Sequence, residues 1–465
     1  MEQDALLTWA AERGIRYRDS VGVARVTPTA TGPTLREALG GPLPTGPADP
    51  FAVVHHLADT LEAGGLMGMA SGRFFGFVIG GAVPAALGAD WLVSAWDQNS
   101  GLFAPTPGTA VCEEVAGQWI LELLGLPSTC SFAFVTGGQM ANTTALAAAR
   151  HHVLAEAGWD VETRGLAGAP RIRILAGDEV HVTVPRATRL LGLGTACLER
   201  VPTDANGAMV PEALARALAS GEPGPTIVCC QAGNVNTGAI DPVGALADLT
   251  HAHGGWLHVD GAVGLWLAAA GSDRIPGLDR ADSWSTDAHK WLNVPYDCGI
   301  TICRHAAAHR ASMTVSASYL LQAEPGTDRD PVDWNPEFSR RARGVPVYAA
   351  LASLGRSGVV SIIDRCCAHA RHFAALLSRE PGVAILNDVV LNQVLVRFLA
   401  EGGSDADHDA RTRGVIAAVQ ADGTCWMGSS VWRGQTVMRI SVSNHATTTA
   451  DVEASVAAIR RAARA

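Results

Sequence analysis

Between residues 106 and 303, short apolar runs alternate with longer segments of helical periodicity. The apolar runs have the length of strands and lie at residues 131–136, 171–175, 226–231, 256–260, 283–285 and 299–303. Helical spacing of apolar positions separates them, most clearly at residues 111–124, 140–157, 211–220 and 242–253. Strands that alternate with helices are typical of βαβ units. This region therefore predicts an α/β fold with a mostly parallel sheet.

The two ends of the chain have different patterns. A helix is expected at residues 4–13, followed by a Pro-, Gly- and Thr-rich run with short helical character at 35–39. From about residue 345 we expect a helix at 347–377, strands at 392–398 and 436–443 and a last helix at 449–461. Three domains follow from these changes: an N-terminal arm, a large α/β domain and a small α+β domain, over residues 1–85, 86–346 and 347–465.

Composition narrows the class of protein. The chain has 465 residues, of which 48% are hydrophobic and 17% charged, and this excludes a mainly disordered or fibrous protein. Its net charge of −10 argues against nucleic acid or an anionic membrane as the main partner. The uncharged stretch at 74–89 is shorter than the ~20 residues of a membrane span, so we expect a buried or interface segment. The ten cysteines form no C-x-x-C pair, and the first residues lack a secretory signal, which together predict a reduced, cytoplasmic protein.

Lys290 is the only lysine among the 35 basic Lys and Arg residues. Arginine replaces lysine on most surfaces, but its guanidinium stays protonated and cannot attack a carbonyl group. Lys290 follows a predicted strand end, where ligands bind in α/β sheets, and Trp284 and Trp291 lie close to it in sequence. We therefore interpret Lys290 as a nucleophilic amine rather than a surface residue.

Asp260 ends the predicted strand Trp-Leu-His-Val-Asp. A carboxylate at the end of an apolar strand suits a contact with a cationic ring nitrogen. A metal site is the alternative, because strand alternation places His258 and Asp260 on one face and His251 and His253 are near in sequence. No further residues show the spacing of metal ligands, so a metal-dependent hydrolase is a remote alternative and no metal is expected.

Two weaker signals accompany these residues. Gly137 and Gly138 join a strand to a helix, and such a turn lets backbone N–H groups approach an anion at the helix N-terminus. His181 follows Gly-Asp-Glu-Val and precedes an expected helix. Each feature alone also occurs for structural reasons. A phosphate turn, a histidine, an aspartate at a strand end and a lysine in this order suit pyridoxal phosphate.

With these features the chain resembles the group II pyridoxal-phosphate-dependent amino-acid decarboxylases, the family of the aromatic-L-amino-acid, histidine and glutamate decarboxylases. His289-Lys290-Trp291, with the upstream His-Val-Asp, carries most of the resemblance. Supporting segments lie at residues 73–77, 141–150, 287–292, 293–299, 334–343 and 438–444. They cover nearly the whole chain in the order of the family.

The resemblance implies the fold of the pyridoxal-phosphate-dependent transferases (aspartate aminotransferase-like, fold type I), with the N-terminal arm serving dimerisation. It implies that Lys290 carries pyridoxal 5′-phosphate, that Asp260 keeps the ring nitrogen protonated and that His181 stacks on the ring. It also implies a catalytic tyrosine on a mobile loop, and Tyr319 stands at the family's spacing after the lysine. The expected catalytic residues are Lys290, Tyr319, His181 and Asp260. The expected cofactor-binding residues are Gly137, Gly138, Gln139, His181, Asn234, Asp260, Ser285, His289 and Lys290.

Several positions depart from the family's pattern. Gln139 stands where a hydroxyl residue is frequent, and Gly261 replaces a common alanine. Residues 232–237 replace a Thr-rich segment. Asp287 occupies a position where asparagine is usual, and an acid beside a phosphate is unexpected unless it faces elsewhere. These departures leave the reaction and the substrate open.

The function expected from the resemblance is that of a carboxy-lyase. It would convert an L-amino acid into the amine and CO₂ through a Lys290 aldimine and a quinonoid. The alternatives on the same scaffold are transamination and decarboxylation coupled to oxidative deamination, which yields an aldehyde. Family members with phenylalanine in place of the tyrosine tend toward aldehydes, so Tyr319 favours an amine. A homodimer with its active site at the interface is expected. The substrate and the role of Arg439, which could bind a carboxylate or support its strand, are left open.

Overall fold

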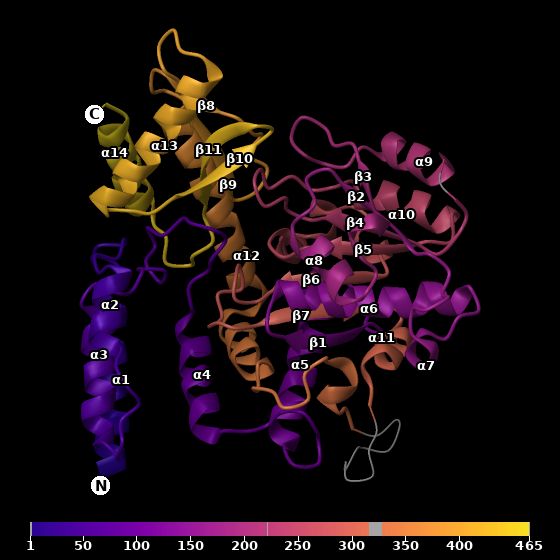
Figure 1. Cartoon of the computed structure of the whole chain (residues 1–465), viewed down its shortest axis with the longest axis horizontal. Coiled ribbons are helices and arrows are strands. Elements are labelled where there is room, and N and C mark those ends of the chain that lie inside the picture. The colour runs from indigo at the N-terminus through magenta and orange to yellow at the C-terminus, as the bar shows by residue number, and fades with distance from the viewer. Residues whose placement is uncertain (1, 221, 316–327, 465) are drawn as a thin grey trace. The chain divides into compact units, whose positions relative to one another are not determined.

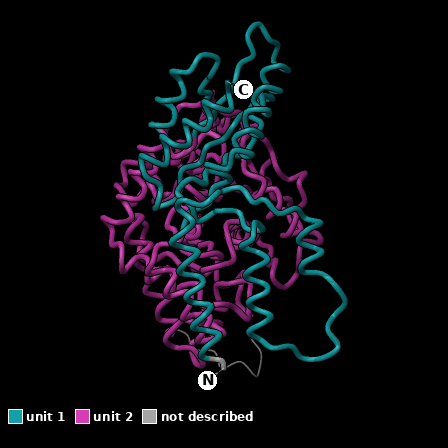
Figure 2. Tube along the Cα trace, turned by 90° about the vertical axis from the view of Figure 1, so that its left-hand side faces the viewer, with its two compact units in different colours: residues 1–81, 371–386, 394–465 teal, residues 82–370, 387–393 magenta. Residues whose placement is uncertain are grey.

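The computed structural model describes the chain except for residues 1, 221, 316–327 and 465. It consists of two compact units, which Figure 2 distinguishes by colour. Unit 1 contains residues 1–81, 371–386 and 394–465, and unit 2 contains residues 82–370 and 387–393. Because compactness alone defines these units, the expected domain boundaries after residues 85 and 346 stay a prediction.

Unit 2 is built on a seven-stranded sheet with the strand order β1-β7-β6-β5-β4-β2-β3 (Figure 1). The strands are β1 (Ser131–Val135), β2 (Arg173–Gly177), β3 (Leu198–Val201), β4 (Thr226–Gln231), β5 (Trp256–Asp260), β6 (Ser283–Asp287) and β7 (Gly299–Cys303). Strand β7 pairs antiparallel with β1 and β6, and the remaining neighbours are parallel. The expected α/β class with a mostly parallel sheet is confirmed.

The helices of unit 2 are α4 (Pro84–Trp96), α5 (Pro107–Leu124), α6 (Gly138–Glu156), α7 (Val161–Arg164), α8 (Thr183–Leu190), α9 (Pro211–Ser220), α10 (Val243–Ala252) and α11 (Ala306–Met313). Short 3₁₀ turns lie at Thr195–Cys197, Gly264–Ala270, Ser272–Arg274, Leu278–Arg280 and Pro331–Trp334. Helix α6 packs on strands β1 and β4–β7, and α10 packs on β4 and β5. The buried alanines of α6 allow this close approach to the sheet.

The turn from β1 into α6 lies directly against β7. A Cβ atom on Gly299, the first residue of β7, would lie 2.4–2.7 Å from backbone atoms of Gly137. Only glycine fits at this position, because no side chain atom can approach a backbone so closely. The packing of Gly299 therefore holds the glycine turn in place at the start of α6.

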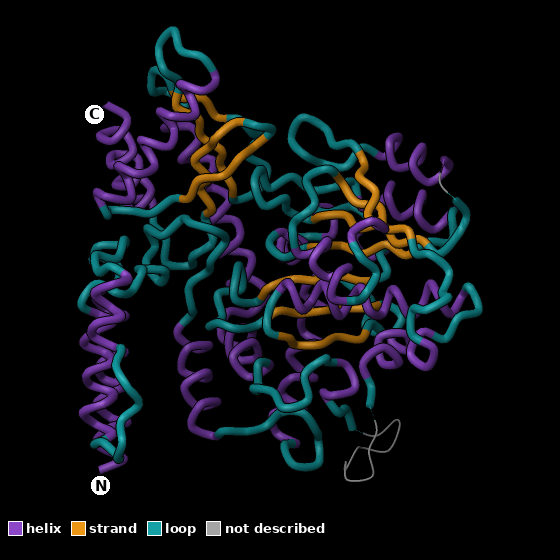
Figure 3. Tube along the Cα trace, in the orientation of Figure 1, coloured by secondary structure: helices purple, strands orange, loops and turns teal. Residues whose placement is uncertain are grey.

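Unit 1 combines helices with a four-stranded sheet of order β10-β11-β9-β8 (Figure 3). Its helices are α1 (Glu2–Ser20), α2 (Gly32–Leu39), α3 (Pro50–Glu62), α13 (Asp405–Asp422) and α14 (Thr449–Arg464). Its strands are β8 (Val383–Ile385), β9 (Gln393–Phe398), β10 (Gly428–Trp432) and β11 (Gln435–Ser441). The C-terminal α+β character is confirmed. Helices α2 and α3 contain no buried residue.

Helix α12 (Gly344–Leu377) is long and apolar enough to cross a membrane, by length and composition alone. Core helices of soluble proteins share these features, and α12 is interrupted at Gly355, whose φ is 58°. The uncharged segment 74–89 contains no long helix. Phe74, Phe75 and Val83 in it are buried, as expected for a core segment, whereas Phe77 is exposed and stacks on Trp426.

Candidate active site

The expected site residues meet at one edge of the sheet of unit 2. Asp260 is the last residue of β5 and Asp287 is the last residue of the parallel strand β6. Lys290 follows three residues later, and its Nζ atom lies 2.8 Å from Oδ2 of Asp287. The backbone N–H of Gly138, at the start of α6, donates to Oδ1 of the same carboxylate over 2.6 Å. This edge is where ligands bind in open α/β sheets.

Asp260 is a buried carboxylate whose two oxygens accept different donors. Its Oδ2 atom accepts from the side-chain amide of Asn142 (3.0 Å) and from the hydroxyl of Thr183 (3.4 Å). Its Oδ1 atom accepts from the backbone N–H of Ala262 (3.2 Å). These three hydrogen bonds fix the orientation of the carboxylate.

A buried polar network orients the amide of Asn142. The Oδ1 atom of Asn142 accepts from the hydroxyl of Ser285 (2.6 Å) and from Nε2 of His258 (2.8 Å). Burial lowers the pKa of His258 to about 4, so the ring is neutral and its Nδ1 atom accepts from Ser283 (2.9 Å). Because the oxygen of Asn142 is thereby occupied, its NH₂ group points to Asp260.

The same hydrogen bonds show whether His258 and Asp260 are available as metal ligands, which was the alternative interpretation of this strand. Strand alternation does place His258 and Asp260 on one face, as expected, since both contact Asn142. Both ring nitrogens of His258 are used in hydrogen bonds to Asn142 and Ser283. Across residues 2–220, 222–315 and 328–464, no three His, Cys, Asp or Glu side chains gather as metal ligands do.

His181 lies half-buried immediately before α8 and is connected to Asp260 through Thr183. Its Nδ1 atom lies 2.9 Å from the hydroxyl of Thr183, which also reaches Asp260. The backbone N–H of His181 donates to the side chain of Gln231 at the end of β4. The structure therefore brings His181 and Asp260 into one hydrogen-bonded group.

The side chain of Asp287 faces the glycine turn at the start of α6. An acid was not expected beside a phosphate-binding turn, so the sequence had suggested that Asp287 points away from it. Its side chain is 2% exposed and contacts Gly138, Lys290 and His289, whose Nε2 atom lies 3.4 Å from Oδ1. The Nδ1 atom of His289 accepts from the backbone N–H of Cys298 (3.0 Å), so Nε2 is the atom that carries the proton. Burial lowers the pKa of His289.

Three residues that were expected to contact the cofactor form hydrogen bonds to other protein groups. The amide of Gln139 donates to the carbonyl of Thr183. Asn234 is buried, and its Oδ1 atom accepts from the backbone N–H groups of Asn236 and Thr237. Ser285 lies behind Asp260 as a donor to Asn142. Contact of these three residues with the cofactor stays a prediction.

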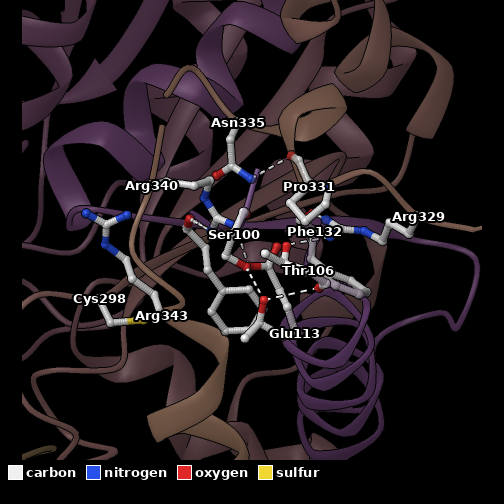
Figure 4. Close-up of polar contacts among 12 residues, drawn as sticks. Ser100, Thr106, Glu113, Phe132, Cys298, Arg329, Pro331, Asn335, Arg340 and Arg343 are labelled. Atoms are coloured by element: carbon white, nitrogen blue, oxygen red, sulfur yellow. Dashed lines mark hydrogen bonds and ion pairs between the residues drawn. The ribbon is translucent and has the colours of Figure 1, made fainter. Parts of the chain in front are cut away.

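Tyr319 lies outside the described residues, so its role rests on its spacing alone. In the described residues from 328 onward, the guanidinium of Arg329 donates to Glu113 of α5 (3.0 Å) and to the carbonyl of Phe132 (Figure 4). Arg340 donates to the second oxygen of Glu113 (2.7 Å) and to the carbonyls of Ser100 and Phe134. One buried carboxylate thus fixes two arginines at residues 329–340.

Sequence reasoning assigned no role to Asn142 or Thr183. The helical spacing contains a signal for Asn142, because it stands four residues after Gly138 and therefore shares its face of α6. Thr183 stands two residues after His181 but has no feature that distinguishes it in the sequence. Arg439, whose role was left open, donates to the carbonyl of Phe77, and burial lowers its pKa.

Comparison with known proteins identifies the family. Residues 47–399 match the model of the pyridoxal-dependent decarboxylase conserved domain. The chain belongs to the pyridoxal-dependent decarboxylases. Tryptophan decarboxylase 1 of Oryza sativa subsp. japonica is 28% identical over 456 residues, which cover 92% of this chain and 87% of that protein. L-2,4-Diaminobutyrate decarboxylase of Rhizobium meliloti (strain 1021) is 28% identical over 389 residues, which cover 82% of this chain and 76% of that protein.

A solved structure supports the fold. The crystal structure of Oryza sativa TDC with PLP and tryptamine superimposes with a TM-score of 0.91 at 24% identity, covering 100% of this chain and 98% of that one. The protein is therefore a pyridoxal phosphate-dependent amino-acid decarboxylase, a carboxy-lyase with the expected fold.

The residues of the site fit this cofactor with one exception. The buried, oriented carboxylate of Asp260 would suit a protonated ring nitrogen, and the amine of Lys290 would suit the aldehyde of the cofactor. Asn142 contacts Asp260 one helical turn beyond Gly138, about 6 Å along α6. This spacing suits a pyridine ring at Asp260 whose phosphate arm reaches the helix N-terminus. The exception is Asp287, whose carboxylate already accepts the N–H of Gly138.

Proposed function

We propose that this decarboxylase converts an L-amino acid into its amine and CO₂, with Lys290, Asp260, His181 and Tyr319 as the acting residues. One observation carries the assignment of roles. The only lysine of the chain and a buried carboxylate with three hydrogen-bond donors lie at the same sheet edge, beside the N-terminus of α6. An amine, an anion and an anion-binding turn are the groups that the aldehyde, ring nitrogen and phosphate of the cofactor require.

Each residue has a separate task in this proposal. When bound, pyridoxal phosphate supplies an electron-poor ring that accepts the electrons released as the carboxylate leaves. Asp260 holds the proton on the ring nitrogen, because a nearby negative charge favours the cationic form. Asn142 keeps that carboxylate oriented. Lys290 supplies the amine that links the cofactor to the protein, and His181 contributes a flat ring whose angle is set by Thr183.

The first experiment tests the linkage at Lys290. We expect the purified protein to be yellow, and borohydride reduction followed by peptide mapping should place the adduct on Lys290. Lys290→Arg should lose both the colour and the adduct, because a guanidinium stays protonated. A protein that stays colourless after reconstitution with pyridoxal phosphate would contradict the proposed role of Lys290.

The second experiment identifies the substrate. Two relatives of equal identity are named for tryptophan and for L-2,4-diaminobutyrate. We therefore propose a panel that includes aromatic, acidic and diamino acids, with release of CO₂ from each as the readout. Accumulation of pyridoxamine phosphate instead of CO₂ would indicate the aminotransferase alternative.

Tyr319 is proposed to direct a proton to Cα of the product, which favours an amine over an aldehyde. A positioned phenol transfers a proton faster than oxygen can react at the same carbon. Tyr319→Phe should slow amine formation and raise aldehyde and peroxide. An unchanged rate and product ratio in this variant would exclude Tyr319 as the proton donor and point to another acid, such as His181.

We also propose a homodimer. A cavity of about 660 Å³ lies between α4, α5 and α12 in unit 2, and the same helices carry exposed apolar side chains. The exposed side chains on these helices are Trp91, Leu92, Trp96, Val111 and Tyr348. Large exposed apolar patches are unusual on monomers, and helices α2 and α3 of the expected dimerisation arm bury no residue within the chain. Light scattering that shows an active monomer would refute the proposal.

A cytoplasmic location is proposed on the state of the cysteines. Nine of the ten are buried, where they behave as small apolar residues. Fractionation of cells that express a tagged chain should recover the activity with cytoplasmic markers, and recovery from a secreted or membrane fraction would contradict the proposal.

A further inference from the structure

Asp287 occupies the position at which the cofactor's phosphate is expected. Its Oδ1 atom accepts the N–H of Gly138 over 2.6 Å. A Cβ atom on Gly138 would lie 2.5 Å from Oδ2 of Asp287. The carboxylate therefore packs directly on the glycine turn, with nothing between them.

The positive charge beside Asp287 is sufficient for one anion but not for two. Lys290 is the only lysine or arginine that forms an ion pair with Asp287 in the described part of the chain. His289 is the other neighbour, and burial lowers its pKa, so its ring is neutral near pH 7. A phosphate that enters the turn meets a carboxylate whose charge is already balanced by Lys290.

We infer that the carboxylate of Asp287 is a built-in competitor for the phosphate of pyridoxal phosphate. Two anions cannot share one backbone N–H group without repulsion at short range. Cofactor binding must therefore displace Asp287, and the chain holds its cofactor more weakly than the same chain with asparagine at this position. The fraction of enzyme that carries pyridoxal phosphate then depends on the concentration of free pyridoxal phosphate. This inference rests on the placement of the phosphate at α6 in the proposed function.

The test compares dissociation constants of the cofactor-free full-length protein and its variants. Asp287→Asn removes the charge and keeps the shape. Asp297→Asn is the matched control, because Asp297 also lies near His289 but forms its ion pair with Arg343 and not with Lys290. Each protein is titrated with pyridoxal phosphate, with inorganic phosphate and with pyridoxal, which lacks the phosphate.

Asp287→Asn should bind pyridoxal phosphate at least about tenfold more tightly than the wild type, which corresponds to 1.4 kcal/mol. Inorganic phosphate should stabilise this variant against heat at lower concentrations than it stabilises the wild type. Binding of pyridoxal should change less than about threefold, and so should every constant of Asp297→Asn. Asp287→Ser, a smaller neutral residue, should share the gain and provides a second variant if the asparagine protein does not fold.

Two results would overturn the inference. A gain of less than threefold for pyridoxal phosphate in both neutral variants would show that Asp287 does not compete. An equal gain for pyridoxal and pyridoxal phosphate would show that the substitution acts through the freed amine of Lys290 and not through the phosphate. Failure of the proposed function is a different result, namely bound cofactor without release of CO₂ from any amino acid.

Discussion

Removing the charge of Glu113 is expected to destabilise unit 2 strongly. Glu113 is fully buried on α5 and binds two guanidiniums, those of Arg329 (3.0 Å) and Arg340 (2.7 Å). Both arginines also donate to backbone carbonyls of strand β1, and Arg340 donates to the carbonyl of Ser100 as well, so neither can turn to solvent easily. Glu113→Gln preserves the shape of the side chain but leaves two cations facing each other.

The magnitude follows from the burial of the group. Breaking a buried ion pair by removing one partner costs about 3–5 kcal/mol, because an uncompensated charge stays in a medium of low dielectric. The matched control is Glu122→Gln on the same helix, where Glu122 is 78% exposed and its partner Arg356 is 50% exposed. Such a surface pair contributes about 0–1 kcal/mol. The two variants should then differ by about 2–5 kcal/mol, and at about 2–4 °C per kcal/mol Glu113→Gln should melt roughly 4–20 °C below the control.

The assay is thermal unfolding of the full-length enzyme, followed by circular dichroism at several scan rates because a chain of two units need not unfold in one step. Arg329→Met combined with Glu113→Gln should recover part of the loss, since it removes one of the two uncompensated cations. The reasoning is refuted if Glu113→Gln melts within about a degree of Glu122→Gln, or if the second substitution lowers the melting temperature further by its full individual effect.

Three further outcomes are expected. Asp260→Ala should retain some cofactor but lose about a hundredfold or more in kcat, and steady-state activity within a few fold of wild type would show that Asp260 is structural. Asn142→Leu should lower kcat about tenfold with a smaller effect on KM, measured in the same assay, because Asp260 loses its orienting donor; equal losses in both parameters would contradict a positioning role. The unfolding free energy in urea should fall by up to about 3 kcal/mol between pH 6.5 and 4, because the unfolded chain then binds a proton that native His258, with its pKa of about 4, does not. His258→Gln should flatten this slope, and an unchanged slope would assign the effect to other groups.

The sequence was sufficient to predict the parts of the site that depend on local periodicity. Alternation along residues 256–260 placed His258 and Asp260 on one face, and both contact α6 through Asn142. Strand-helix alternation placed Asp260 and Lys290 at strand ends, and the parallel pairing of β5 with β6 brings those ends together. The alternation of side chains along a strand and the succession of strands and helices can both be read from a single sequence. The shared face of His258 and Asp260 and the placement of Asp260 and Lys290 at strand ends could therefore be predicted.

Other features depend on contacts between distant segments. Glu113 and its partners Arg329 and Arg340 are separated by more than two hundred residues, so no spacing rule connects them. Helix α3 was not predicted, because it buries no residue within the chain and its apolar positions are not selected by a core. The short strands β3, β8 and β10 were missed for a related reason, since none of them is fully buried.

Strand alternation in β6 determines which face of the sheet the side chain of Asp287 lies on. Ser283 and Ser285 of β6 both take part in the hydrogen bonds around His258 and Asn142, so they face α6. Alternation then requires Asp287 to face α6 as well and Thr286 to face the opposite side. An acid at position 286 would have pointed away from the glycine turn, whereas an acid at 287 cannot do so while the register of β6 is kept. The competition between Asp287 and phosphate is therefore a consequence of strand register, and only a substitution at position 287 itself can remove it without disturbing the sheet.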